Sequence, residues 1–371
     1  MPRGLLALAF ILGLSPPLLA STCPPIERRA GPPVYALLYG YPYGPPSQLE
    51  PLSMVDHDLV NMTWFFRSLG LRGLRVHGES SPLLKHRLGT PLYPATWRAL
   101  LGSVEAIAGH IRSHPMPSPD GRRPQVYVYF VGHGLVGARD RLELFARPDG
   151  DGPGYDGELD SKLIAEHIVR PLAVLADVHL IADTCYGYHL IQTRTAAYSR
   201  DKRGPRPPLD MAYTHDFADA FPHVGALLAT RGVTYSLSDR GGAFSHAVRS
   251  VAVGPADLDE DGIITYAEMA DALERTRSTS PLLNIATVVG PGDDSDAPFI
   301  QWRKSPAARV CVPRNRSEES ALWDGSSRFA LIEAGPEPLP LWLEAGHTFG
   351  LQSAGTIWRF EALDSVLRLG R

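Results

Sequence analysis

A histidine and a cysteine stand at the ends of two apolar runs in the middle of the chain. His133 follows the run 126–131, and Cys185 follows the run 178–182. Alone, each has an ordinary structural explanation, as a turn residue and a small core residue. A cysteine attacks a carbonyl carbon as the thiolate, however, and a neighbouring imidazole is the usual group that generates it. Together the two residues predict a nucleophile and its base.

The elements that must position this pair are predicted to be neighbouring strands. Continuous apolar runs of this length are typical of strands buried on both faces. Apolar residues also recur at helical spacing over 52–69 and 97–111. Strands that alternate with helices indicate a mainly parallel sheet with helices on both faces. Parallel strands end at one edge of the sheet, where open α/β folds usually hold their sites.

We therefore expect an α/β fold, followed by a smaller unit. Further strands are expected at 34–40, 74–77, 224–229 and 282–289, a hairpin arm at 142–145, and a helix at 161–175 with Asp160 as N-cap. Over residues 299–371, short alternating runs separated by turn residues predict a small antiparallel β module. The module is either a structural cap or a substrate-binding or surface-binding unit.

The two central motifs resemble those of the caspase, metacaspase and gingipain group of cysteine peptidases. In that group a His-Gly pair follows one strand and the cysteine closes the next, as His133-Gly134 and Asp183-Thr-Cys185 do here. The resemblance covers about residues 34–290, and we assign 34–295 to a caspase-like peptidase domain. It implies hydrolysis of peptide bonds through a His133/Cys185 dyad. The backbone N–H groups of Gly134 and Cys185 are the expected oxyanion donors.

The resemblance also implies a substrate pocket. In metacaspases the aspartate two places before the nucleophile lines the pocket for the residue before the scissile bond, and an aspartate of the first helix joins it. The matching residues here are Asp183 and Asp58. Two carboxylates would select Arg or Lys. Two alternatives stay open: Asp183 only caps local amides, or the pocket takes Asp, as in caspases proper, with Arg240 nearby.

Residues 257–268 fit the loop of an EF-hand position by position, with a glycine at the sharp turn. The predicted ligands are the side chains of Asp257, Asp259 and Asp261, the backbone carbonyl of Ile263, Thr265 through water, and the bidentate carboxylate of Glu268. The cofactor that we expect is Ca2+. A single loop lacks its usual partner, so the ion is expected to be structural or activating rather than a switch.

The N-terminus predicts export. Residues 1–21 have a basic start, an apolar core and a small-residue end, as in a secretory signal peptide, and they are too short for a membrane span. We expect a periplasmic, cell-envelope or extracellular protein without a membrane span, and a lipid anchor on Cys23 is a weaker alternative. In an oxidising compartment Cys23 and Cys311 can pair and leave Cys185 as a thiol, or all three stay unpaired.

The partners that we expect are protein or peptide substrates. A formal net charge of −4 gives no strong attraction to nucleic acid. The basic, proline-rich stretch 200–208 is expected to be exposed, with self-cleavage near Lys202 or Arg203. The function predicted is an exported, calcium-binding cysteine endopeptidase. The alternative is a catalytically silent caspase-fold scaffold, against which the presence of both His133 and Cys185 argues.

Overall fold

The structure is a computed structural model that describes residues 31–44, 49–115, 121–137, 141–191, 217–229, 236–237, 241–279, 287–302, 307–312, 314–324, 327–336 and 338–362. The predicted signal peptide and the basic stretch 200–208 lie outside these ranges. Among the helices described, none is long and apolar enough to cross a membrane.

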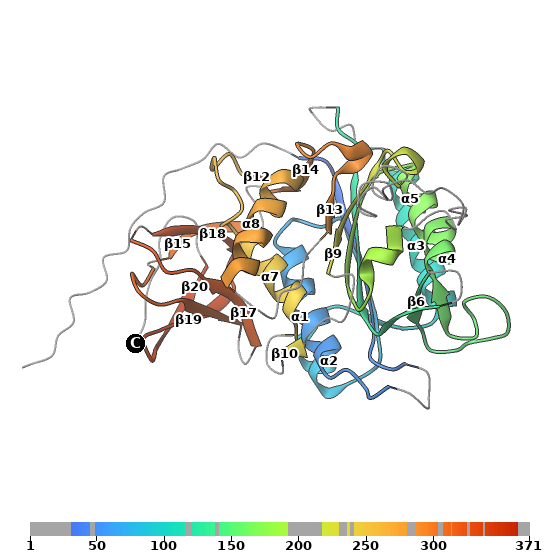
Figure 1. Ribbon diagram of the computed structural model, residues 1–371, viewed down its shortest axis with the longest axis horizontal. Coiled ribbons are helices and arrows are strands. Elements are labelled where there is room, and N and C mark those ends of the chain that lie inside the picture. Colours follow the sequence, from blue (N-terminus) through green and yellow to red (C-terminus); the bar gives the residue numbers. More distant parts are fainter. Residues whose placement is uncertain are drawn as a thin grey trace, which may run out of the picture.

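A seven-stranded sheet forms the centre of the molecule (Figure 1). Its strands, in spatial order, are β13 (Thr287–Val289), β9 (Val224–Leu228), β8 (Asp177–Thr184), β4 (Gln125–Gly132), β1 (Val34–Tyr41), β2 (Gly73–Gly78) and β3 (Leu92–Pro94). All neighbours pair in parallel except β13, which runs antiparallel to β9. The expectation of a mainly parallel sheet is confirmed.

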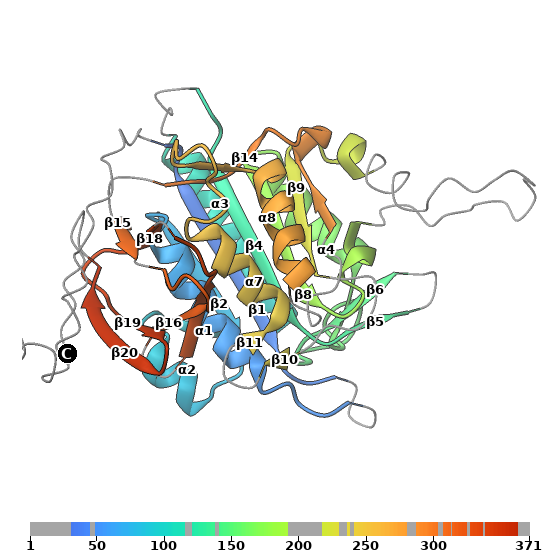
Figure 2. The same cartoon turned by 60° about the vertical axis from the view of Figure 1, so that its left-hand side comes forward.

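Helices cover both faces of this sheet (Figures 1 and 2). One face carries α3 (Trp97–Ser113), α4 (Ser161–Ile164) and α5 (Arg170–Ala173). The other carries α1 (Met54–Arg67), α7 (Ala243–Ala252) and α8 (Tyr266–Thr279), with α2 (Pro82–Arg87) beside α1. Apolar side chains from each layer and the facing side of the sheet form a separate hydrophobic cluster.

The helix predicted at 161–175 is present but interrupted. The carboxylate of Asp160 accepts the backbone N–H of Leu163 at 2.8 Å, as expected of an N-cap. Between α4 and α5 the chain forms a π-helical turn, η1 (Ala165–Val169). Pro171 explains this, because it has no N–H for the carbonyl of His167 and its ring crowds that carbonyl.

Short strands lie around the two ends of the main sheet. β5 (Gly134–Val136), β6 (Leu142–Phe145) and β7 (Glu158–Asp160) form an antiparallel sheet that begins directly after His133. The hairpin β10 (Ser236–Leu237) and β11 (Gly241–Gly242) precedes α7, and β12 (Ile263–Thr265) pairs with β14 (Pro298–Gln301). Two short 3-10 helices, η2 (Gly187–Ile191) and η3 (Pro291–Asp293), follow β8 and β13.

The C-terminal strands form small antiparallel sheets, as predicted. β15 (Ala307–Val312) pairs with β18 (Leu339–Glu344), and a second sheet has the order β17 (Ser327–Ile332), β16 (Ser320–Asp324), β19 (Thr348–Ser353) and β20 (Thr356–Glu361). This β module packs on the α1 and α7 side of the molecule (Figure 2). Its apolar residues, such as Phe329 and Trp342, belong to the same hydrophobic cluster as those of α1 and α7.

Two buried histidines make the stability of this fold depend on pH. His179, in β8, stacks on Tyr127, and its Nδ1 lies 2.7 Å from the hydroxyl oxygen of Tyr266. His77, in β2, has its Nε2 2.9 Å from Oγ of Ser103. Burial lowers the pKa of His179 to about 3 and that of His77 to about 4. Below pH 6.5 the unfolded chain therefore binds protons that the folded chain does not, and the free energy of unfolding decreases as the pH is lowered.

We expect acidification from pH 7 to pH 5 to lower the free energy of unfolding by about 2 kcal/mol for each of these histidines. Urea unfolding at the two pH values measures this. In His179→Gln the loss of unfolding free energy between pH 7 and pH 5 should be smaller by the contribution of one histidine. His86→Gln, at an exposed position of α2, should show the same loss as the wild type. Equal pH dependence in all three proteins would contradict the prediction.

Candidate active site and calcium loop

His133 and Cys185 leave the main sheet side by side. β4 and β8 are parallel neighbours, and their register pairs Gly132 with Thr184 at the last position of each strand. His133 and Cys185 are the next residues of the two chains, so both start from the carboxyl edge of the sheet. The structure brings the predicted nucleophile and base to one edge, as the sequence indicated.

Gly134 lies against the backbone of the cysteine. A Cβ atom placed on Gly134 would lie 2.2 Å from the carbonyl oxygen of Cys185, closer than any side chain allows. Only glycine therefore permits this approach of the two segments. The contact shows that the residues following β4 and β8 pack directly on each other.

The backbone turns sharply after the cysteine. Tyr186 has a φ of 57°, in the left-handed region that few residues other than glycine adopt. The chain then enters η2 instead of continuing in the strand direction. Such backbone strain recurs at functional sites, where the surrounding structure holds it in place. Here it leaves Cys185 at the tip of the turn, half-buried and not in a disulfide.

A backbone carbonyl orients the imidazole. Nε2 of His133 lies 2.8 Å from the carbonyl oxygen of Glu50. A carbonyl only accepts, so Nε2 carries the proton in the neutral ring and Nδ1 holds the lone pair. Burial lowers the pKa of His133, and the bond to Glu50 partly opposes this. The sequence did not reveal Glu50, because a main-chain acceptor has no side-chain signature.

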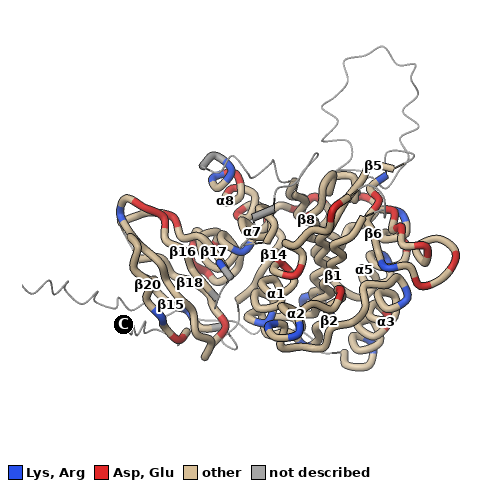
Figure 3. The backbone as a smooth tube through the Cα atoms, turned by 90° about the horizontal axis from the view of Figure 1, so that it is seen from below, with Lys and Arg blue, Asp and Glu red and all other residues tan. Residues whose placement is uncertain are grey.

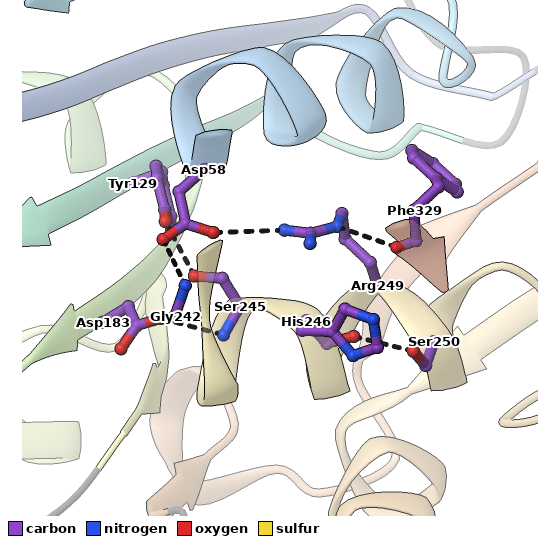
Figure 4. A network of polar contacts seen from close by, with 9 residues as sticks. All are labelled: Asp58, Tyr129, Asp183, Gly242, Ser245, His246, Arg249, Ser250 and Phe329. Carbon is purple, nitrogen blue, oxygen red and sulfur yellow. Dashed lines mark hydrogen bonds and ion pairs between the residues drawn. The ribbon is translucent and has the colours of Figure 1, made fainter. Parts of the chain in front are cut away.

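Asp58 and Asp183 meet at the beginning of α7 (Figure 4). Asp58 comes from α1 and Asp183 from β8, and both are fully buried. Oδ2 of Asp58 accepts the N–H of Gly242 at 2.7 Å, and Oδ2 of Asp183 accepts that of Ser245 at 2.9 Å. Gly242, the N-cap residue, has no side chain to cap the helix. The two carboxylates therefore supply the cap and sit at the positive end of the helix dipole.

Arg249 is a residue of this site that sequence reasoning missed. It is fully buried in α7, and its Nη1 lies 3.4 Å from Oδ1 of Asp58. Burial raises the pKa of Asp58 well above its ordinary value; Asp183 adds to this, and Arg249 opposes it. Burial likewise raises the pKa of Asp183, against its bonds to Ser245. Nothing in the sequence distinguishes Arg249 from a surface arginine of a helix.

The two carboxylates differ in how fully they are bonded. Both oxygens of Asp58 have partners, Gly242 and Arg249. Oδ1 of Asp183 is buried and has no hydrogen-bond partner among the described residues. The predicted capping of backbone amides is thus observed for one oxygen of Asp183, and the other remains available as an acceptor.

The loop between α7 and α8, predicted to be an EF-hand loop, brings three acidic side chains together. Carboxylate oxygens of Asp257, Asp259 and Asp261 lie within 4.8 Å of one another. Gly262 has a φ of 82°, which the sharp turn requires, and both oxygens of Glu268 point back at the loop, one at the N–H of Leu258 and the other at Thr265. Ile263, whose backbone carbonyl was a predicted ligand, is the first residue of β12 and is paired with Gln301.

Asp257 is the most buried of the three aspartates. Its residue surface is 8% exposed, and its Oδ1 is buried without a hydrogen-bond partner among the described residues. A buried carboxylate oxygen normally has a donor or a metal ion. Oxygen ligands of this number and charge fit Ca2+.

Cys311 is disulfide-bonded, whereas Cys185 is not. Cys23, the partner expected for Cys311, lies outside the described residues. Arg240, the alternative pocket residue, also lies outside them.

Comparison with family models gives no match, and neither does comparison with curated proteins. Among solved structures, the crystal structure of caspase-1 from Spodoptera frugiperda is similar to this chain at 12% identity and a TM-score of 0.38, over 73% of this chain and 94% of that chain.

The close approach at Gly134 gives a testable prediction. We expect Gly134→Ala to lower the free energy of unfolding by about 1–3 kcal/mol, because the added methyl group must displace the Cys185 carbonyl. Gly102→Ala is the matched control: it is an exposed α3 position with nothing within 4 Å of the new atom, and it should stabilise the protein by about 1 kcal/mol. Chemical denaturation measures both, and a neutral or stabilising Gly134→Ala would contradict the packing described.

Proposed function

We propose that the protein is a cysteine endopeptidase with His133 as base and Cys185 as nucleophile. The observation that carries the proposal is the register of β4 and β8, whose paired last residues place the two side chains at one edge of the sheet. The left-handed turn at Tyr186 and the orientation of His133 by Glu50 support it.

The proposed reaction uses these groups in order. Nδ1 of His133 takes the thiol proton, and the Cys185 sulfur attacks the peptide carbonyl carbon. The backbone N–H groups of Gly134 and Cys185 hold the developing oxyanion. His133 returns the proton to the leaving amine as the carbon–nitrogen bond breaks. Water then hydrolyses the thioester and releases the acid.

We further propose that the substrate has Arg or Lys before the scissile bond. The resemblance to metacaspases implies a carboxylate-lined pocket, and Asp58 and Asp183 lie together at the N-terminus of α7. Asp183 keeps one acceptor oxygen without a partner among the described residues. A cationic side chain would satisfy this oxygen through a charge-assisted hydrogen bond.

Peptide hydrolysis tests the dyad. With fluorogenic peptides that end in Arg, Lys or Asp, we expect the wild type to cleave the basic ones. Cys185→Ala and His133→Ala should each lower kcat/KM at least about a thousandfold, since these residues act as a unit. The matched control is His189→Ala, a half-buried histidine of η2 in the same edge region, which should retain activity.

Absence of hydrolysis of every peptide by the folded wild type, with and without calcium, would favour the alternative of a catalytically silent scaffold. Cleavage that survives Cys185→Ala would assign the activity to another group.

We also propose that the loop 257–268 binds Ca2+. The three clustered aspartates, the orientation of Glu268 and the unpartnered oxygen of Asp257 support this. The ion would neutralise part of the charge that the aspartates bring together and would hold the end of α7 to the start of α8. Because Asp58 and Asp183 cap the N-terminus of α7, calcium would also steady the helix against which the proposed pocket residues lie.

Isothermal titration calorimetry and thermal unfolding test this site. We expect calcium to bind the wild type and raise its Tm. Glu268→Gln should weaken binding about a hundredfold, because it removes a charged bidentate ligand. Glu274→Gln, on the same helix but paired with Arg277, is the control and should bind as the wild type does. An unchanged affinity of Glu268→Gln would remove the assignment.

We propose, finally, that the protein is exported. The disulfide at Cys311 supports this, because disulfides persist mainly in oxidising compartments.

A further inference from the structure

The C-terminal β module reaches the two pocket carboxylates through a single side chain. Nε of Arg249 donates to the backbone carbonyl of Phe329 in β17 at 3.2 Å, and Nη1 of the same guanidinium faces Asp58 (Figure 4). A second bond, from the N–H of Leu331 to Oγ of Ser250 at 2.9 Å, holds the next residue of α7 to the same strand. The bond to the Phe329 carbonyl therefore fixes the direction in which the guanidinium points.

Arg249, Asp58 and Asp183 are three fully buried charged residues near the N-terminus of α7. Lys, Arg, Asp and Glu residues are otherwise scattered along the described backbone (Figure 3). Arg249 is fully buried and stays protonated, so it needs an anion nearby. Asp58 supplies this anion and uses its second oxygen on Gly242. Asp183 bonds Ser245 through one oxygen only.

We propose that Arg249, oriented by the C-terminal β module, is the internal counter-ion of Asp58. Because the charges of Arg249 and Asp58 cancel, the proposed pocket has the negative charge of one carboxylate, that of Asp183. Arg249 is then a positioning residue that acts through Asp58 on substrate preference, and the β module is part of the specificity site rather than a cap alone. The inference rests on the proposed peptidase function.

Single changes in the pair should shift substrate preference in opposite directions. Asp58→Asn leaves a buried guanidinium without its anion beside Asp183, so the pocket becomes more positive. Arg249→Gln removes the cation and leaves two carboxylates, so the pocket becomes more negative. Together the two changes remove both charges of the pair and leave the charge of Asp183. If Arg249 and Asp58 only packed against each other, both single variants would instead shift the substrate preference in the same direction.

The experiment compares two peptides that differ only before the scissile bond, one with arginine and one with its uncharged analogue citrulline. The readout is the ratio of their kcat/KM values. We expect about a fivefold fall in this ratio for Asp58→Asn, about a fivefold rise for Arg249→Gln, and the wild-type ratio for the double variant, from the effect of one charge several ångströms away. Ser250→Ala, which removes the other bond to β17, should keep the wild-type ratio.

Shifts of the same sign in both single variants, with no recovery in the double variant, would overturn the inference. If either single variant does not fold, the double variant and Arg249→Lys are compared with the wild type. Unchanged ratios in both support the inference, and loss of the preference for arginine in the double variant overturns it.

A wild type that cleaves neither peptide would refute the proposed function, and the pairing is then read from unfolding free energies. Asp58→Asn and Arg249→Gln should each destabilise the protein, and the double variant should be more stable than the sum of the two losses predicts. Additive losses would refute the pairing on their own.

Discussion

The parallel pairing of β4 with β8 is the constraint on which the rest of the structure depends. A shift of one residue in this register would turn each side chain to the other face of the sheet and separate the ends of the strands. The register is fixed because both strands are buried on both faces, between α3 on one side and α1 and α7 on the other. The packing of two helical layers thus determines where His133 and Cys185 emerge.

The N-terminus of α7 is the second point at which distant parts of the chain meet. Two glycines precede α7 and offer no side chain to cap it, so carboxylates from α1 and β8 accept its first N–H groups. A methyl group on Gly242 would lie 2.0 Å from Oδ2 of Asp183, so the close approach also requires glycine. One helix end therefore ties β8, the strand that precedes Cys185, to the helix that leads into the loop 257–268.

Sequence reasoning found the features that depend on local pattern. The strand before His133, the hairpin arm at 142–145 and the N-cap Asp160 each follow from periodicity or residue spacing, and the structure has them where they were expected. It missed features set by tertiary contact. The antiparallel direction of β13 depends on its pairing with β9. The carbonyl of Glu50 and the burial of Arg249 have no signature in the sequence, because neighbours from distant segments create both.

The shared hydrophobic cluster of α1, α7 and the β module has a consequence for the order of events during synthesis. Ribosomes make the chain from its N-terminus, so the strands of the β module emerge after α1 and α7. Until then, one face of α1 and α7 lacks its covering layer, and Arg249 lacks the carbonyl that orients it. The β module is therefore needed for the observed orientation of Arg249, and an N-terminal fragment that stops before β17 would lack it.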